Sequence, residues 1–151
     1  MNSPMIEQIL QLIERSQTIF VAAHESPDGD AIGSTLALAN ALREMGKDVV
    51  AYNNDKAPLE YAFLPGYDSV VNELDESQTF DAGFVLDAGD LSRAGGWIRE
   101  RCRSLVNIDH HPFSEDFGDI YYVDTDACAT GVLIYRILQA AGHQVSNDVA
   151  T

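Results

Sequence analysis

The sequence predicts an α/β domain in which a mainly parallel sheet carries helices on both faces. Short apolar runs rich in strand-forming residues alternate with stretches of helical periodicity along the chain. Parallel neighbours in a sheet need crossover connections, which are usually helices. Polar residues also follow directly after three of the apolar runs, where open parallel sheets gather ligands. We therefore expect residues 1–151, which are 46% hydrophobic, to form one domain with a substantial core.

The first half of the chain is expected to begin with an amphipathic helix, because four apolar residues recur at helical spacing. These residues are Ile6, Ile9, Leu10 and Ile13. The elements that follow are a strand over residues 18–23, a helix over 30–45, a strand over 48–52 and a short helix around 59–62. Gly46 directly follows the long helix, as a glycine at a helix C-terminus commonly does.

The second half repeats the alternation. Its expected elements are a strand over 82–86, a helix over 97–103, strands over 104–108 and 120–123, and a helix over 127–141. The last helix has one continuous apolar face and ends at Gly142. Neither a repeat nor a long linker interrupts the pattern, so we expect no internal domain boundary.

Acidic residues dominate the charge of the chain. There are 24 Asp and Glu against 9 Lys and Arg, and the formal net charge is -15. This charge repels a long polyanion such as duplex DNA over most of the surface, so a nucleic-acid substrate is expected to be short. Bound divalent cations would offset part of the negative charge locally.

The cysteines and the N-terminus indicate a cytoplasmic location. Cys102 and Cys128 have neither the spacing of a zinc cage nor that of a disulfide framework, and we interpret them as two buried free thiols in a reducing compartment. Residues 1–17 lack the basic start and the apolar stretch of a signal peptide, and no run is long enough to cross a bilayer. We expect no contact with a membrane.

The first group of candidate metal ligands follows the strand expected at 18–23. His24, Asp28 and Asp30 lie close together in the sequence, and carboxylates packed this tightly repel one another unless cations lie between their oxygens. In the alternative interpretation, Asp28 and Asp30 form a turn and cap the next helix, because Asp is favoured at N-caps. Metal binding and helix capping are compatible, because the two carboxylates can each take a different role.

Asp87 is the second candidate ligand. It ends an apolar run and is followed by small residues, which leaves room for a carboxylate that bridges two ions. Its alternative interpretation is a cap of a helix or loop. For the nearby Asp90 and Arg93, we favour a salt bridge that ties the loop together.

Asp109-His110-His111 is the most specific short motif in the chain. Adjacent histidines on a loop are often ordinary polar residues, but these follow an apolar strand. One imidazole can then bind a metal while Asp109 orients a ring nitrogen, and the other imidazole is free to meet a phosphate oxygen. His143 follows a helix end, where a surface role that compensates the helix dipole is expected.

Taken in order, His24-x-x-x-Asp28-x-Asp30, Asp87 and Asp109-His110-His111 resemble motifs I, II and III of the DHH phosphoesterase superfamily. The resemblance covers nearly the whole chain. Residues 24–34 and 61–66 are similar to the branch that contains the nanoRNase and pAp-phosphatase enzymes. The resemblance therefore implies a DHH domain whose branch degrades very short oligonucleotides and dephosphorylates 3′-phosphoadenosine 5′-phosphate (pAp).

The resemblance also implies a role for each motif residue. The implied ligands are His24, Asp28 and Asp87 for one Mn2+ ion and Asp30, Asp87 and His110 for the other. Asp87 would bridge the ions, His111 would contact the scissile phosphate, and Asp109 would support the histidine pair. In such sites the two cations activate water and neutralise the charge that develops on phosphorus. Oxygen and imidazole ligands without thiolate suit Mn2+, with Mg2+ as the alternative.

The family pattern continues past the motifs found here. A fourth-motif Asp that completes the second metal site, and a smaller C-terminal DHHA1 domain that binds the nucleotide, normally lie beyond the position of Thr151. Residues 147–151 are typical of a helix start, with Asp148 as its N-terminal cap rather than a ligand. We therefore expect an N-terminal DHH domain fragment, with impaired turnover and with metal binding retained by His24, Asp28 and Asp87.

Three functions are compatible with these motifs. The leading hypothesis is a Mn2+-dependent phosphoesterase that releases mononucleotides from short oligonucleotides, phosphate from pAp, or both. The metal site alone does not separate this activity from that of a pyrophosphatase, an exopolyphosphatase or a cyclic-dinucleotide phosphodiesterase. The third hypothesis is a non-catalytic metal-binding module. A homodimer is compatible with each of them.

Overall fold

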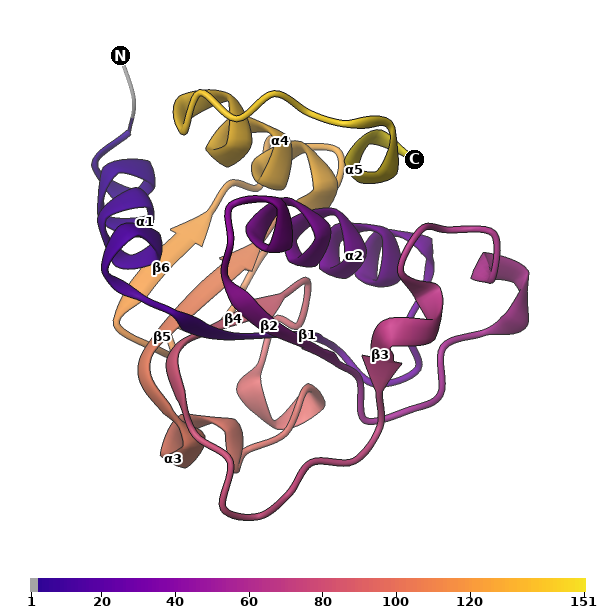
Figure 1. Ribbon diagram of the computed structural model, residues 1–151. Coiled ribbons are helices and arrows are strands. Elements are labelled where there is room, and N and C mark those ends of the chain that lie inside the picture. Colours follow the sequence, from indigo (N-terminus) through magenta and orange to yellow (C-terminus); the bar gives the residue numbers. More distant parts are fainter. Residues whose placement is uncertain (1–2) are drawn as a thin grey trace.

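One sheet organises the molecule, as the computed structural model, which describes residues 3–151, shows in Figure 1. Six strands pair in parallel in the order β3-β2-β1-β4-β5-β6, which confirms the predicted class. The strands are β1 (Thr18–Ala23), β2 (Asp48–Tyr52), β3 (Val70–Val71), β4 (Phe80–Leu86), β5 (Cys102–Asp109) and β6 (Ile120–Val123). The strand order reverses direction between β1 and β4, and doubly wound sheets bind ligands at such a switch point.

Helices cover both faces of the sheet, as predicted. The α-helices are α1 (Pro4–Arg15), α2 (Gly29–Glu44), α3 (Ile98–Arg101), α4 (Thr130–Ala140) and α5 (Asn147–Ala150). The single-turn 3-10 helices are η1 (Leu59–Tyr61), η2 (Tyr67–Ser69) and η3 (Leu91–Arg93). Figure 1 shows α1, α2, α4 and α5 on one face of the sheet and α3 on the other.

Alternating side chains of the central strands build two apolar layers. Ile19 and Val21 of β1 join the layer packed beneath α1, α2 and α4, whereas Phe20 and Ala22 join the layer on the α3 side. The ring of Phe20 is buried and lies 5.9 Å from the ring of Trp97. Successive side chains of a strand point to opposite faces, so a sheet covered on both sides needs the nearly continuous apolar runs that the sequence contains.

Several boundaries differ from the sequence prediction. The short edge strand β3 is too brief to carry a periodic signal. Strand β5 begins at Cys102 rather than two residues later, because Cys102 already pairs with Phe80 of β4. Helix α4 begins at Thr130 rather than at 127, because Ala127 belongs to a turn in which its amide donates to the carbonyl of Asp124 at 3.2 Å.

Two local interpretations were wrong. Asp148 does not cap α5, because the N-cap is Ser146, whose hydroxyl accepts a hydrogen bond from a backbone amide of the helix. Within residues 3–151, Asp90 and Arg93 form no ion pair. Instead Asp90 caps η3 and Arg93 donates to a backbone carbonyl, so both side chains stabilise the loop through its backbone.

Other residues considered in the sequence lie outside the site described below. Both cysteines are free thiols, as predicted, but only Cys102 of the two is buried; the predicted burial of Cys128 was wrong, because Cys128 lies exposed in the turn before α4. Nε2 of His143 lies 2.7 Å from Oε2 of Glu44, near the C-terminus of α2. In the part of the chain that the structure describes, none of the helices combines the length and the apolar character needed to cross a bilayer.

Candidate metal centre

Three strand ends bring the predicted ligands to one edge of the sheet. His24 follows β1, Asp87 follows β4 and Asp109 ends β5, and these three strands are neighbours in the sheet. Because the strands are parallel, their carboxyl ends lie on the same edge. The switch point between β1 and β4 therefore lies between His24 and Asp87.

Asp87 lies at the centre of the site. Its side chain is 1% exposed, and its backbone has φ +59°, a left-handed conformation that Asp adopts more readily than most residues. Its Oδ2 lies 3.4 Å from Nε2 of His24. Its Oδ1 lies 3.5 Å from Nε2 of His110 and 3.4 Å from Nδ1 of His111. Each oxygen faces a different set of histidines, which is the arrangement that a bridging carboxylate requires.

His24, Asp28 and Asp87 form the first group of candidate ligands, with one ligand atom from each lying within 4.8 Å of the others. Nε2 of His24 is 3.7 Å from Oδ1 of Asp28 and 3.4 Å from Oδ2 of Asp87. These separations are longer than good hydrogen bonds. They are close to the roughly 3 Å that separates adjacent ligands of one octahedral ion with bonds of about 2.1 Å. The first group therefore fits a hard divalent cation.

Backbone contacts orient two of these ligands. Nδ1 of His24 is hydrogen-bonded to the carbonyl of Glu25, which leaves Nε2 for the carboxylates. Asp28 caps α2, where its Oδ1 accepts a hydrogen bond from the amide of Ala31 at 3.0 Å. The capping interpretation of Asp28 is thus confirmed, and the capping oxygen Oδ1 is also the one that faces Nε2 of His24 at 3.7 Å. The polar contact with Asp87 raises the pKa of His24 above its ordinary value, although burial opposes this shift.

Asp87, His110 and His111 form the second group, again with ligand atoms within 4.8 Å of one another. Asp30 lies beside it, with Oδ2 at 3.4 Å from Nε2 of His110. The structure thus brings together the three ligands that the resemblance implied for a second ion, and it adds His111 to them. Asp30 is also engaged elsewhere, because its carboxylate accepts hydrogen bonds from two backbone amides at the start of α4.

Hydrogen bonds fix the rings of the histidine pair. Nδ1 of His110 lies 3.2 Å from the carbonyl oxygen of Ala127. Oδ1 of Asp109 accepts hydrogen bonds from the backbone amides of His110 and His111 and lies 2.7 Å from Nδ1 of His111. Burial by itself raises the pKa of Asp109, but the hydrogen bonds from His111 outweigh it and hold the pKa below its ordinary value. Asp109 is therefore an ionised partner of His111.

Thr130 is a residue of the site that the sequence did not predict. This residue is completely buried at the start of α4, and its hydroxyl donates to Oδ1 of Asp87 at 3.1 Å. Its amide donates to Oδ2 of Asp30 at 2.9 Å. One feature of the local sequence points to this region. Ala129, the N-cap of α4, has no side chain that can accept hydrogen bonds from the first amides of the helix, so these amides need an acceptor from elsewhere in the fold.

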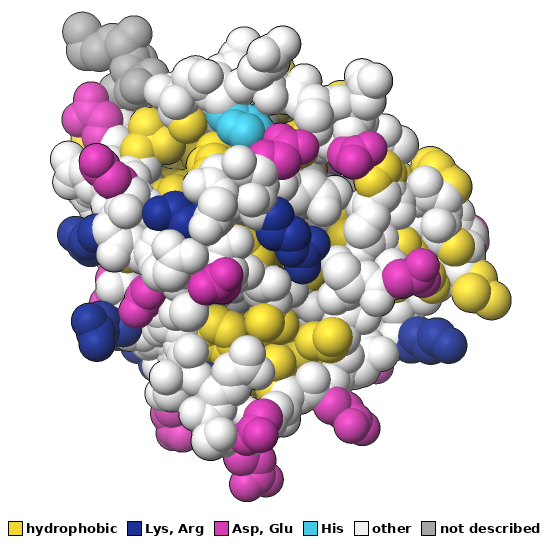
Figure 2. Space-filling model, viewed as in Figure 1, with side chains coloured by type: hydrophobic (Ala, Val, Ile, Leu, Met, Phe, Trp, Pro, Cys, Tyr) yellow, Lys and Arg dark blue, Asp and Glu magenta, His cyan; other side chains and the backbone are white. Residues whose placement is uncertain are grey.

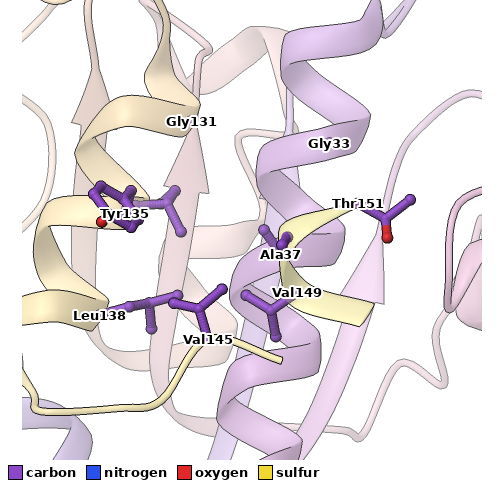
Figure 3. A pocket seen from close by; sticks show the side chains of 10 residues that line it. Gly33, Ala37, Gly131, Tyr135, Leu138, Val145, Val149 and Thr151 are labelled. Carbon is purple, nitrogen blue, oxygen red and sulfur yellow. The ribbon is translucent and has the colours of Figure 1, made fainter. Parts of the chain in front are cut away.

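An apolar groove lies apart from these ligands, between α2, α4 and α5 (Figure 3). Its volume is about 340 Å³. Gly33 and Ala37 of α2 face Tyr135 and Leu138 of α4 across it, and Val149 of α5 lies at one side. The residues that line it include no acidic, basic or histidine side chain, so it offers no charged group or imidazole to a phosphate or to a metal ion.

Acidic and basic side chains are interspersed on the face seen in Figure 2, rather than gathered into separate patches. Acidic groups are spread over this face, and the Lys and Arg side chains among them do not join into a continuous track. This face therefore lacks the basic stripe that long nucleic acids need.

The fold and the site together define a class of protein. An all-parallel α/β sheet presents two groups of carboxylate and imidazole ligands at its switch point, and one buried aspartate is common to both. This is the architecture of a candidate binuclear metal centre. Residues 18–151 match the family described as the DHH family, N-terminal domain. The chain belongs to this family, which confirms the resemblance seen in the motifs.

The chain is also similar to individual proteins of known name or structure. The bifunctional oligoribonuclease and PAP phosphatase NrnA of Thermus thermophilus is 33% identical over 150 residues, which cover 97% of this chain and 44% of that protein. The manganese-dependent inorganic pyrophosphatase of Methanothrix thermoacetophila is 27% identical over 144 residues, which cover 89% and 44%. The crystal structure of an exopolyphosphatase-related protein from Bacteroides fragilis superposes with a TM-score of 0.89 at 26% identity, covering 97% of this chain and 46% of that one. The chain spans about half the length of these proteins.

Proposed function

We propose that this domain belongs to a metal-dependent phosphohydrolase that cleaves short oligonucleotides, pAp, or both. The observation that carries the proposal is the buried Asp87 carboxylate, whose two oxygens face His24 on one side and the His110-His111 pair on the other. The substrate class is supported by the relative named as an oligoribonuclease and PAP phosphatase. The net charge of -15 also favours a short substrate over a long duplex.

The ligand groups fit two divalent cations. His24, Asp28 and Asp87 would hold one ion, and Asp87, His110 and Asp30 would hold the other, with His111 at its edge. Mn2+ suits oxygen and imidazole ligands, and one relative is named as manganese-dependent, with Mg2+ as the alternative. When bound, such ions supply Lewis-acid activation of water and neutralise phosphate charge.

The chain's own residues prepare the site for a phosphate. His111 is 47% exposed at its side chain, and its Nδ1 is held by Asp109. A carboxylate only accepts hydrogen bonds, so Nδ1 carries the proton toward Asp109, and Nε2 is left for a phosphate oxygen. His111 would thus bind the substrate, while the buried Asp109 keeps the ring in that orientation. In this proposal the substrate approaches from the exposed side of His111.

The test is hydrolysis by the full-length protein that contains this domain. Asp87→Ala removes the carboxylate common to both ligand groups, so we expect hydrolysis of pAp and of dinucleotides to fall by several orders of magnitude, and a chelator to abolish it in the wild type. Asp68→Ala is a matched control, because Asp68 is an exposed carboxylate in η2 and lies outside the ligand groups. Undiminished hydrolysis in Asp87→Ala would end the proposal.

A second candidate function is hydrolysis of pyrophosphate, favoured by the similarity to a manganese-dependent inorganic pyrophosphatase. Both activities use the same ligand types, so the metal centre does not separate them. A substrate panel of pAp, dinucleotides, pyrophosphate and cyclic dinucleotides would separate them by relative kcat/KM. Metal binding without turnover of any of these compounds by the full-length protein would favour the non-catalytic module instead.

A further inference from the structure

The turn before α4 and the first turn of that helix touch every side chain proposed for the second ion. The carbonyl of Ala127 lies 3.2 Å from Nδ1 of His110. The amides of Thr130 and Gly131 donate to the two oxygens of Asp30, at 2.9 and 3.0 Å. The hydroxyl of Thr130 donates to Oδ1 of Asp87 at 3.1 Å. A single short segment thus contacts ligands that come from α2 and from the residues directly after β4 and β5.

Thr130 is the residue of this segment that joins two of these ligands. Its backbone binds Asp30 and its side chain binds Asp87, and it is completely buried. Its hydroxyl therefore has no access to bulk water and keeps the carboxylate as its partner. The oxygen it binds, Oδ1, is the one that faces His110 and His111, whereas Oδ2 faces His24. The contact thus acts on one side of the bridging carboxylate.

We propose that Thr130 is a positioning residue for the second metal site. Its hydroxyl holds the rotation of the Asp87 carboxylate, and its amide, together with that of Gly131, holds Asp30 at a set distance from Asp87. The inference rests on the metal centre proposed above, and it specifies how that centre keeps two carboxylates in place before an ion is bound. Hydrogen bonds to metal ligands from outside the ligand set typically change metal affinity by about 10- to 100-fold.

Helix α4 makes this support rigid. Its N-cap, Ala129, makes no side-chain hydrogen bond, so Asp30 takes the place of a capping residue through the tertiary structure. The N-terminus of a helix carries partial positive charge, which favours the Asp30 carboxylate at this position. Displacing Asp30 would leave two amides of α4 without an acceptor, so the helix and the ligand hold each other.

The experiment compares Mn2+ binding by the full-length protein that contains this domain and by its variants, using calorimetry and the electron paramagnetic resonance of free Mn2+. Thr130→Val removes the hydroxyl and keeps the shape, whereas Thr130→Ser keeps the hydroxyl. We expect Thr130→Val to weaken, by about 10- to 100-fold, the binding event that His110→Ala abolishes, and Thr130→Ser to restore it to within a few-fold of wild type. The event that depends on His24 should change much less.

Thr35→Val is the matched control. Thr35 is a buried threonine of α2 whose hydroxyl donates to the carbonyl of Ala31, so this variant loses a buried hydroxyl without touching a ligand carboxylate. Equal Mn2+ affinity in Thr130→Val and wild type, or an equal loss in Thr35→Val, would overturn the inference. Failure of the wild type to bind Mn2+ would instead overturn the metal centre itself. If Thr130→Val does not fold, Thr130→Ala removes the hydroxyl without placing a methyl group against Asp87, and the same comparison applies.

Discussion

Asp30 provides a sharp test, because the structure gives it a role that a metal ligand alone would not have. Its carboxylate accepts hydrogen bonds from the amides of Thr130 and Gly131 and from the hydroxyl of Ser34. If Asp30 were only a ligand, removing its charge from an acidic site without metal would relieve repulsion and stabilise the chain. If Asp30 also caps α4, the same change is expected to destabilise the metal-free chain.

The size of the effect follows from the contacts. Asn in place of Asp30 has one carbonyl oxygen and one amide nitrogen, so at least one backbone amide of α4 faces a donor instead of an acceptor. Leaving such a buried amide unpaired costs about 1–3 kcal/mol. The loss of negative charge at the helix N-terminus adds about 0.3–1 kcal/mol. We expect Asp30→Asn to lower the free energy of unfolding by about 2 kcal/mol.

The assay is urea unfolding of the chain at pH 7 in the presence of EDTA, with 0.5 M NaCl to screen repulsion between carboxylates. Asp28→Asn is the matched control, because Asp28 caps α2 through one hydrogen bond, and Asn caps a helix about as well as Asp. We expect this control to stay within about 0.5 kcal/mol of wild type. An Asp30→Asn chain as stable as wild type would refute the capping role.

Two further predictions concern groups outside the site. The ion pair with Arg99, followed by the hydrogen bond from the amide of Leu105, lowers the pKa of Asp119 despite partial burial. A carboxyl whose pKa is lower in the folded state stabilises the fold above its unfolded pKa of about 3.9 and loses this effect as the pH falls through the folded pKa. Because the pair is nearly half exposed, Asp119→Asn should cost only about 1 kcal/mol in urea unfolding at pH 7. The cost should shrink as the pH falls below the unfolded pKa and through the lowered folded pKa, and a cost that did not shrink on acidification would contradict the electrostatic explanation. Burial raises the pKa of the Cys102 thiol to about 12, whereas Cys128 is exposed. At pH 8 the native chain should therefore release one equivalent of thionitrobenzoate from Ellman's reagent rapidly and a second only in denaturant. Rapid release of two would show that Cys102 is accessible.

Local patterns in the sequence were enough to predict the α/β class and most of the strands. Apolar runs with strand-forming residues marked β1, β4 and β5, and the helical periodicity marked α1 and α4. Each of these signals depends on residues that lie near one another in the chain, so no knowledge of the fold is needed to detect it. The polar residues directly after the strands could also be predicted as members of one site, because the carboxyl ends of parallel strands lie at a common edge of the sheet.

Contacts between distant segments could not be predicted in this way. Thr130 and Asp30 are 100 residues apart, and Thr130 and Asp87 are 43 apart. A threonine at the start of a helix is unremarkable in sequence, and its partners depend on the strand order and on how α4 packs against α2. The predictions for the start of α4, the cap of α5 and the contacts of Asp90 and Arg93 were wrong for a related reason. Several local hydrogen-bonding patterns compete there, and packing selects among them.

The class of fold, the types of candidate ligand and their order along the chain can all be predicted from local sequence patterns. That the two oxygens of Asp87 face different histidines, and that the amides of α4 hold Asp30, is evident only from the packed fold. Ligand type is a property of single side chains, whereas the distances between ligands are set by backbone elements that approach one another only when the core packs.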